Sequence, residues 1–365
     1  MNIVVTGANG FVGKNLIQAL GESVECEIFK VTRDTTSAEL ESYVAKADFI
    51  FHLAGENRPT NVEDFYKNNA NFTEQLCSVA KNTNKKIPIL YTSSTQSSLD
   101  NDYGKSKKQA EDLLSEYSES TGTKTYIYQL PNVFGKWSKP NYNSVVATFC
   151  YNVVNGIPLV NNAPEKVLNL VYIDDVVKEF INTLNEGVKK EAYPIYNITL
   201  QNLQEQIESF KHVRETNIIE KVGTSITRAL YSTYLSFVQP KDFSYSLVKH
   251  EDPRGVFVEM LKTKESGQFS FFTAHPGITR GGHYHHSKNE KFLVIRGKAR
   301  FGFRNMITNE KYELIVTSDK PVVVDTVPGW THDITNIGDE EMIVMLWANE
   351  IFDRENPDTF TAKVD

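Results

Sequence analysis

The sequence predicts an α/β domain with a doubly wound parallel sheet over residues 1–240, followed by an all-β domain over residues 241–365. The first part alternates short β-rich runs with longer amphipathic segments, which is typical of βαβ units. After Phe243 the runs are short, aromatic or β-branched, and separated by Gly, Pro, Asn and Asp. Six of the eight histidines lie after residue 249, so the two parts are expected to carry different chemistry.

The α/β part reads as strand and helix in turn. Strands are expected at Ile3–Thr6, Glu27–Thr32, Phe49–Leu53, Ile87–Tyr91 and Lys124–Gln129, and helices at Phe11–Leu20, Glu39–Lys46, Val62–Thr83 and Tyr103–Thr121. Residues 186–240 fit no single pattern, although Leu203–Val213 and Ile226–Leu235 are helical in character. Because strands that alternate with helices make right-handed crossovers, these elements predict one parallel sheet.

The all-β part is expected to form an antiparallel sandwich or small barrel. Its strands are expected at Gln268–Thr273, Glu290–Arg296, Arg300–Arg304, Lys311–Val316, Pro321–Asp325 and Met342–Trp347. The boundary between the two domains is placed near Gln239-Pro240.

Composition excludes several classes of partner. The 365 residues include 39 basic and 46 acidic ones, a net charge of −7, and neither part is basic. A nucleic-acid or anionic-membrane surface is therefore not expected. The longest apolar run, Met342–Ala348, is far shorter than the ~20 residues that cross a bilayer. Three widely spaced cysteines and no visible signal peptide favour the reducing cytoplasm.

A glycine motif directly follows the first expected strand. Gly7, Gly10 and Gly13, with Phe11 and Val12 between them, open the first expected helix. Glycines at this spacing let the backbone approach a pyrophosphate at a helix N-terminus, so a dinucleotide site is predicted.

The residue type at the end of the second expected strand indicates which dinucleotide binds. An acidic residue there would bind the ribose hydroxyls of NAD, whereas an arginine would bind the 2′-phosphate of NADP. Arg33 favours NADP, and the alternative is a solvated arginine beside Asp34.

Tyr103 and Lys107 form a Y-x-x-x-K pair on an expected helix, one turn apart and on one face. A nearby ammonium lowers the pKa of a phenol, which lets tyrosine act as an acid or base near neutral pH. The strand end Tyr91-Thr92-Ser93-Ser94-Thr95 precedes this pair and supplies hydroxyls that could bind a substrate carbonyl.

These motifs resemble the extended short-chain dehydrogenase/reductases that act on sugar nucleotides, which have a Rossmann-type fold. The resemblance includes His52-Leu53-Ala54-Gly55, Pro131-Asn132-Val133-Phe134-Gly135 and Val171-Tyr172-Ile173-Asp174-Asp175-Val176. It implies that Tyr103 is the proton donor, that Lys107 orients the nicotinamide ribose, and that Ser94 holds the keto oxygen. Ser93 or Thr95 could take the place of Ser94. Leu53, Ala54 and Gly55 are expected at the cofactor with the glycine motif.

The second domain contains a metal-ligand pattern. His283, His285 and Glu290 are followed by a distant P-G-x-x-H that contributes His332. Residues i and i+2 of a strand point to the same side, so His283 and His285 can converge. Imidazoles with one carboxylate suit zinc, and also iron or manganese. His286 is expected to face away.

These residues resemble the two motifs of the cupins, which are jelly-roll domains. Asp252-Pro253-Arg254-Gly255-Val256-Phe257-Val258-Glu259 and Arg280-Gly281-Gly282-His283 also resemble dTDP-4-keto-sugar 3,5-epimerases, in which that histidine is a general base. His283 is therefore a ligand or a base, and it is assigned as a ligand. Arg254 and Arg280 are expected to contact substrate, and Arg280 is a plausible anion stabiliser.

Together the halves resemble bifunctional capsular polysaccharide enzymes that join an extended reductase to a zinc cupin. The resemblance implies C3 epimerisation of UDP-2-acetamido-2,6-dideoxy-4-hexulose by the cupin and C4 reduction with NADPH by the reductase domain. The expected product is UDP-2-acetamido-2,6-dideoxy-L-talose, a precursor of N-acetyl-L-fucosamine. Asn132, Lys136 and Asn143 are candidate substrate contacts, with loop structure as the alternative.

A homodimer is expected, because cupins often pair subunits by exchanging strands. Two alternatives remain open. The chain is a 4-ketoreductase with a structural zinc, or its cupin serves only for sugar binding or dimerisation.

Overall fold

The computed structural model describes residues 1–365, which form two compact units. One unit comprises Met1–Glu208 and Arg228–Val238, and the other comprises Ser209–Thr227 and Gln239–Asp365. The architecture confirms the predicted parallel-sheet α/β domain followed by an all-strand domain. The boundary expected near residue 240 stays a prediction. None of the helices combines the length and apolar character that a membrane span requires.

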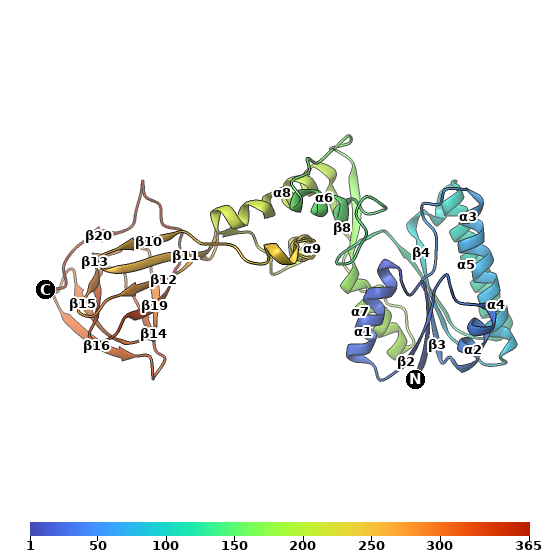
Figure 1. The fold of residues 1–365 in the computed structure, drawn as a ribbon, viewed down its shortest axis with the longest axis horizontal. Coiled ribbons are helices and arrows are strands. Elements are labelled where there is room, and N and C mark those ends of the chain that lie inside the picture. The colour runs from blue at the N-terminus through green and yellow to red at the C-terminus, as the bar shows by residue number, and fades with distance from the viewer. The chain divides into compact units, whose positions relative to one another are not determined.

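The first unit contains a five-stranded parallel sheet in the order β2-β1-β3-β4-β5. The strands are β1 (Asn2–Thr6), β2 (Glu27–Val31), β3 (Phe49–His52), β4 (Ile89–Ser94) and β5 (Thr125–Leu130). Both faces are covered, by α1 and α7 on one side and by α2, α4 and α5 on the other (Figure 1). All parallel strands end at the same edge, so the residues after β1, β3 and β4 are brought together there.

The helices of the first unit include those expected and two that were not, α6 and α7, and α9 begins in the second unit. They are α1 (Phe11–Ser23), α2 (Ser37–Lys46), α3 (Glu63–Phe65), α4 (Phe72–Asn82), α5 (Asp102–Thr121), α6 (Val145–Val154), α7 (Ile173–Glu186) and α9 (Ser225–Leu235), with the 3₁₀ turn η2 (Thr95–Ser98) before α5. A small sheet of β6 (Asn132–Phe134), β7 (Val167–Tyr172) and β8 (Tyr196–Thr199) lies beyond β5. The helix α8 (Leu200–Thr216) runs from one unit into the other.

Two expected elements are wrong in detail. The continuous helix expected over Val62–Thr83 is interrupted by a π-helical segment, η1 (Tyr66–Asn71), between α3 and α4. The strand expected over Ile87–Tyr91 runs instead from Ile89 to Ser94, because Thr92, Ser93 and Ser94 pair with β5.

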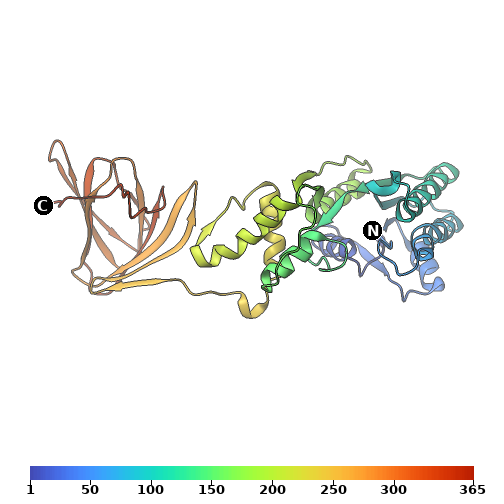
Figure 2. The same cartoon turned by 90° about the horizontal axis from the view of Figure 1, so that it is seen from above.

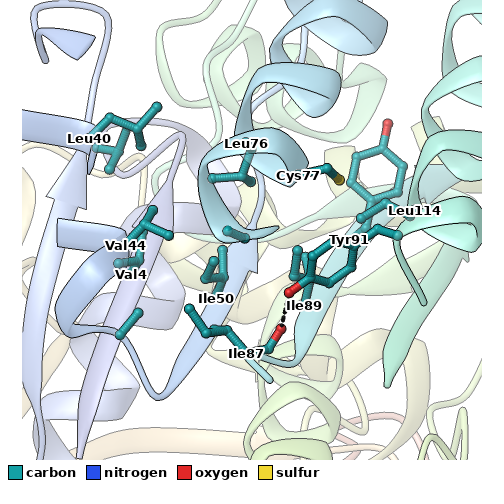
Figure 3. Packing of buried hydrophobic residues seen from close by; sticks show 14 of the residues in the cluster. Val4, Leu40, Val44, Ile50, Leu76, Cys77, Ile87, Ile89, Tyr91 and Leu114 are labelled. Carbon is teal, nitrogen blue, oxygen red and sulfur yellow. Dashed lines mark hydrogen bonds between the residues drawn. The ribbon is translucent and has the colours of Figure 1, made fainter. Parts of the chain in front are cut away.

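The core beneath α2, α4 and α5 is apolar and fully closed. Val4 of β1, Ile50 of β3, Leu76 of α4 and Leu114 of α5 are each 0% exposed. Figure 3 shows these side chains packed with Leu40 and Val44 of α2. Burying one such side chain stabilises a fold by about 1.5–3 kcal/mol. The packed core therefore fixes the position of the strands whose carboxyl ends carry the site.

The second unit has no helix after η3 (Pro240–Asp242), and its strands form two sheets (Figures 1 and 2). One sheet has the order β10-β11-β12-β19-β14-β17, with β9 beside β11, and the other has the order β16-β15-β18-β13-β20. The rings of Phe292 and Phe301, one from each sheet, are 5.9 Å apart, so the two sheets share a core.

The strands of the second unit are short, as expected. They are β9 (Ile218–Ile219), β10 (Lys249–Asp252), β11 (Gly255–Thr263), β12 (Gly267–Ala274), β13 (Thr279–Tyr284), β14 (Glu290–Arg296), β15 (Lys298–Asn305), β16 (Lys311–Thr317), β17 (Val323–Asp325), β18 (Trp330–Asn336), β19 (Met342–Ala348) and β20 (Phe360–Thr361).

Candidate functional site

The turn between β1 and α1 has no room for side chains at its glycines. A Cβ on Gly7, whose φ is +66°, would lie 2.7 Å from the backbone nitrogen of Ala54. A Cβ on Gly13 would lie 2.3 Å from the carbonyl oxygen of Gly7. The helix starts after Gly10 without a side-chain cap, so its first amides are available to an anion. This turn has the form that a pyrophosphate requires.

The loop after β3 is attached to the same turn. The Thr6 hydroxyl accepts hydrogen bonds from the backbone amides of Leu53 and Ala54, each at 3.1 Å. A Cβ on Gly55 would lie 3.0 Å from Nζ of Lys107. The structure thus brings the expected cofactor residues of the glycine turn, the loop 53–55 and Lys107 into one place.

Tyr103 is positioned by a close approach of α5 to η2. Asn101 caps α5 by accepting a hydrogen bond from the Gly104 amide at 2.8 Å. A Cβ on Gly104 would lie 2.3 Å from the carbonyl oxygen of Gln96, so only glycine allows this approach. It places Tyr103 close enough to Ser94 for the serine hydroxyl to lower the pKa of the phenol.

Ser94 is the hydroxyl of its run that lies at Tyr103. Ser93 is buried and donates to the Glu111 carboxylate at 2.5 Å, whereas Thr95 is exposed at the start of η2. Burial raises the pKa of Tyr103, and the hydrogen bond with Ser94 lowers it in part.

Lys107 is buried and directed at Tyr91. Its ammonium donates to the Tyr91 hydroxyl at 3.1 Å and to the Thr92 carbonyl oxygen at 2.9 Å. Burial lowers the pKa of Lys107 to about 8. The expectation that this ammonium lowers the pKa of Tyr103 is wrong for this state, because burial of the phenol has the larger effect and Lys107 faces another tyrosine.

Two polar groups behind this site have contacts that the sequence does not predict. Tyr91 is expected only as one of the hydroxyl-bearing residues of the strand end, not as the acceptor of the Lys107 ammonium. Asn69 lies in the π-helical segment and is 0% exposed, with hydrogen bonds to both backbone groups of Glu56 and to the Ser106 hydroxyl. No signal in the sequence distinguishes either residue from ordinary core or helix positions.

Arg33 stands at the end of β2 with its side chain 89% exposed. Its guanidinium donates to Glu56 at 2.8 Å, and the Tyr142 hydroxyl donates to the other oxygen of that carboxylate at 3.0 Å. Glu56 binds only Nη2 of the Arg33 guanidinium, so the other N–H groups of the guanidinium face solvent.

The candidate substrate residues of this unit have protein partners. Lys136 forms an ion pair with Asp174, and the Asn143 side-chain oxygen accepts from Arg58 at 3.2 Å. The Asn132 amide donates to the carbonyl oxygen of Asn169 at 3.4 Å. These contacts fit the loop-structure alternative as well as a substrate role.

The four candidate metal ligands converge in the second unit. The ligand atoms of His283, His285, Glu290 and His332 all lie within 4.8 Å of one another. Nε2 of His285 and Nε2 of His332 are 3.3 Å and 3.5 Å from the same oxygen of Glu290. His283 joins them, with its ring centre 4.7 Å from that of His332. His286 contacts Tyr284 and Phe360 instead.

The donor set fits a divalent metal in chemistry and in protonation. Both ring nitrogens of His332 are buried without a hydrogen-bond partner. Burial would raise the pKa of Glu290, but His285, His332 and the Lys288 ammonium hold it well below its usual value. Burial, followed by the neighbouring His332, lowers the pKa of His283 to about 4. Neutral imidazoles and an ionised carboxylate are the forms that bind metal.

Arg280 links this cluster to a neighbouring cleft. It lines a cavity of about 140 Å³ with His283, Glu290 and His332, and also an open cleft of about 560 Å³ with Arg254. Its Nη2 is buried without a partner, whereas Arg254 is paired with Asp252 at 2.6 Å. An anionic ligand in the cleft would meet both guanidiniums.

Comparison with known proteins gives two family matches. Residues 3–199 match the NAD dependent epimerase/dehydratase family. Residues 250–360 match the polysaccharide biosynthesis C-terminal domain.

Similar full-length proteins are known. A UDP-2-acetamido-2,6-beta-L-arabino-hexul-4-ose reductase of Pseudomonas aeruginosa is 53% identical, over 100% of this chain and 99% of the relative. The crystal structure of the capsular polysaccharide assembling protein CapF from Staphylococcus aureus matches with a TM-score of 0.92 and 44% identity over 100% of both chains. UDP-glucose 4-epimerase of Thermotoga maritima matches 65% of this chain and 98% of its own, with a TM-score of 0.55 and 17% identity, which shows a shared fold.

Proposed function

The chain belongs to the NAD dependent epimerase/dehydratase family, and on this premise we propose that it is a bifunctional sugar-nucleotide enzyme that epimerises and then reduces a 4-keto sugar. As a member of that family it is an enzyme that uses a nicotinamide cofactor. The proposed substrate is UDP-2-acetamido-2,6-dideoxy-4-hexulose, and the proposed product is UDP-2-acetamido-2,6-dideoxy-L-talose, a precursor of N-acetyl-L-fucosamine in surface polysaccharide. The full-length identity to a reductase of such a sugar nucleotide supports this substrate class.

The observation that carries the reductase activity is the contact between Tyr103 and Ser94 beside Lys107. The bound cofactor supplies the hydride to C4. Ser94 holds the keto oxygen, and the Tyr103 hydroxyl donates the proton that completes the alcohol. Lys107, next to Gly55 of the cofactor loop, orients the ribose, and solvent returns the proton to Tyr103 after the transfer.

NADPH is proposed as the cofactor because of Arg33. Its exposed guanidinium just after β2 would bind the 2′-phosphate, and its hydrogen bond to Glu56 orients it. Phosphate is recognised well by the planar donor fork of arginine.

The second unit is proposed to exchange the proton at C3. Such a proton is acidic only where the neighbouring carbonyl oxygen can carry negative charge. A divalent metal, proposed to be zinc, would stabilise that charge if His283, His285, Glu290 and His332 hold it. Arg280, which lines the same cavity and has a buried Nη2 without a partner, would stabilise the anion, and Arg254 would bind the diphosphate. A homodimer through the cupin is proposed with it.

The reductase proposal is tested by following NADPH oxidation with the UDP-keto sugar. Tyr103→Phe is expected to lower kcat by about 100-fold or more, because the proton donor is lost. Tyr312→Phe makes the same change at a side chain that is 58% exposed, and it should keep wild-type turnover. Substantial turnover in Tyr103→Phe would count against its role.

The epimerase proposal is tested in D₂O without NADPH. The wild type should incorporate deuterium at C3, and His332→Ala should incorporate much less. His275→Ala, at an exposed side chain, serves as the control. If the wild type incorporates none, the second unit has no epimerase role and the chain is a 4-ketoreductase whose cupin is a structural, sugar-binding or dimerisation module.

A further inference from the structure

The segment after β19 lies along the strands that carry the candidate metal ligands. β20 pairs with β13, so that Thr361 is opposite His283 and Phe360 is opposite Tyr284. The Ala362 amide donates to the carbonyl oxygen of Gly282 at 2.9 Å, and its carbonyl oxygen accepts from Thr331, the neighbour of His332, at 2.6 Å. This segment therefore contacts the surroundings of two ligands.

Asp358, just before β20, fastens the loop between His285 and Glu290. Its carboxylate accepts hydrogen bonds from the backbone amides of His286, Ser287 and Lys288 at 2.9, 2.7 and 2.8 Å. The Ser287 hydroxyl donates to the same carboxylate at 2.9 Å. Three successive amides around one carboxylate fix the path of the loop.

The backbone of the same residue contacts a ligand directly. Nδ1 of His285 lies 2.5 Å from the carbonyl oxygen of Asp358. A carbonyl oxygen only accepts hydrogen bonds, so Nδ1 must carry the hydrogen atom. In a neutral ring, Nε2 then keeps its lone pair, and Nε2 is the atom that lies 3.3 Å from Glu290 inside the ligand cluster.

We propose that Asp358 is a positioning residue of the metal centre: its carboxylate holds the ligand loop, and its carbonyl oxygen selects the His285 tautomer that presents Nε2 to the metal. The inference rests on the proposed metal site. Partners in this position orient a ligand ring and fix its tautomer, and their loss typically lowers metal affinity by about 10- to 100-fold.

The test compares Zn²⁺ affinity of the full-length protein and its variants by competition with a chromophoric chelator. Asp358→Ala removes every carboxylate contact and is expected to weaken Zn²⁺ binding about 10- to 100-fold. Asp358→Asn keeps the shape of the side chain and one acceptor oxygen, so its loss of Zn²⁺ affinity should be intermediate. If Asp358→Ala fails to fold, the test is made with Asp358→Asn. Asp353→Ala is the matched control, because Asp353 belongs to the same segment and its hydrogen bond to the Glu355 amide is local.

A second readout follows the tautomer itself. In histidine-selective ¹⁵N spectra of the metal-free protein, the wild type and Asp353→Ala should show His285 protonated on Nδ1, and Asp358→Ala should show a mixture of tautomers. Unchanged Zn²⁺ affinity and an unchanged tautomer in both Asp358 variants would overturn the positioning role alone. A wild type that binds no Zn²⁺ would overturn the proposed metal site, and this inference with it.

Discussion

The ammonium nitrogen of Lys107 lies 3.1 Å from the hydroxyl of Tyr91 and 4.7 Å from the centre of the same ring. Tyr91 is 0% exposed, and burial raises its pKa well above that of a free phenol. It therefore stays neutral and acts as a fixed acceptor for the buried ammonium. Its ring also stacks on His52, at 5.1 Å between centres, so its position is set by the core.

Removing this acceptor should alter the pH profile of the reductase. Lys107 has a pKa of about 8, lowered by burial, so activity that needs its ammonium should fall as pH rises through 8. The hydrogen bond to Tyr91 favours the charged form, and Tyr91→Phe should therefore move this alkaline limb down by about one pH unit or more. The measurement is kcat/KM against pH.

Tyr117→Phe is the control for that change. Tyr117 is also fully buried, but its hydroxyl donates to the carbonyl oxygen of Ile87 and is absent from the Lys107 contacts. It should lower stability without moving the limb. A Tyr91→Phe profile that matches the wild type would show that the acceptor does not set the charge of Lys107.

A methyl group on Gly104 should separate Tyr103 from Ser94. The added Cβ would meet the carbonyl oxygens of Gln96 and Leu99 at 2.3 and 2.6 Å, so α5 must move away from η2. Gly104→Ala is expected to lower stability by about 1–3 kcal/mol and to reduce kcat more than KM changes. Gly21→Ala in α1 meets nothing within 4 Å and should raise stability by about 0.5–1 kcal/mol. Equal behaviour of the two variants would contradict the packing argument.

Chelation should destabilise the second unit. A ligand at about 100 times its Kd stabilises a fold by about 2.7 kcal/mol, so removing a bound divalent metal should lower Tm by several degrees. His332→Ala should be insensitive to the chelator, because it has lost a ligand. His212→Ala, at an exposed residue paired with Glu215, should respond like the wild type. A wild-type Tm that does not change when the chelator is added would argue against a bound metal.

Arg33 should control the choice of nicotinamide cofactor. Arg33→Ala removes a charge-assisted contact worth about 1.5–3 kcal/mol, so KM for NADPH is expected to rise about 10- to 100-fold while KM for NADH changes little. Arg58→Ala makes the same change at an arginine that contacts Asn143, and it should leave the ratio unaltered. An equal rise in KM for NADPH and NADH would mean that Arg33 does not bind the 2′-phosphate.

The fold was predictable where burial repeats with a regular period. Ile3, Val4 and Val5 are all fully buried in the centre of a two-sided parallel sheet, so β1 appears in the sequence as a continuous apolar run. The π-helical segment η1 was not predictable. Asn69 occupies a buried position there through hydrogen bonds to Glu56 and Ser106, and apolar periodicity carries no information about a buried amide.

Site residues were predictable where one short segment holds them. The glycine turn and the His283–Glu290 segment have fixed spacings that follow from backbone geometry. Tyr91 and Asp358 have no such spacing, since their contacts join residues 16 and 73 positions apart and depend on how strands pair. The loss of phenol acidity at Tyr103 was also hidden, because burial is a property of the folded chain.

The attachment of the glycine turn to the loop 53–55 has a thermodynamic consequence. Both amides that follow β3 are bound to Thr6, and there is no room between Gly7 and the Ala54 backbone for a Cβ. The cradle is thus ordered by the protein's own hydrogen bonds, with no need of a ligand. The conformational entropy lost on cofactor binding should therefore come mainly from the dinucleotide. The turn itself should keep its conformation when the cofactor binds.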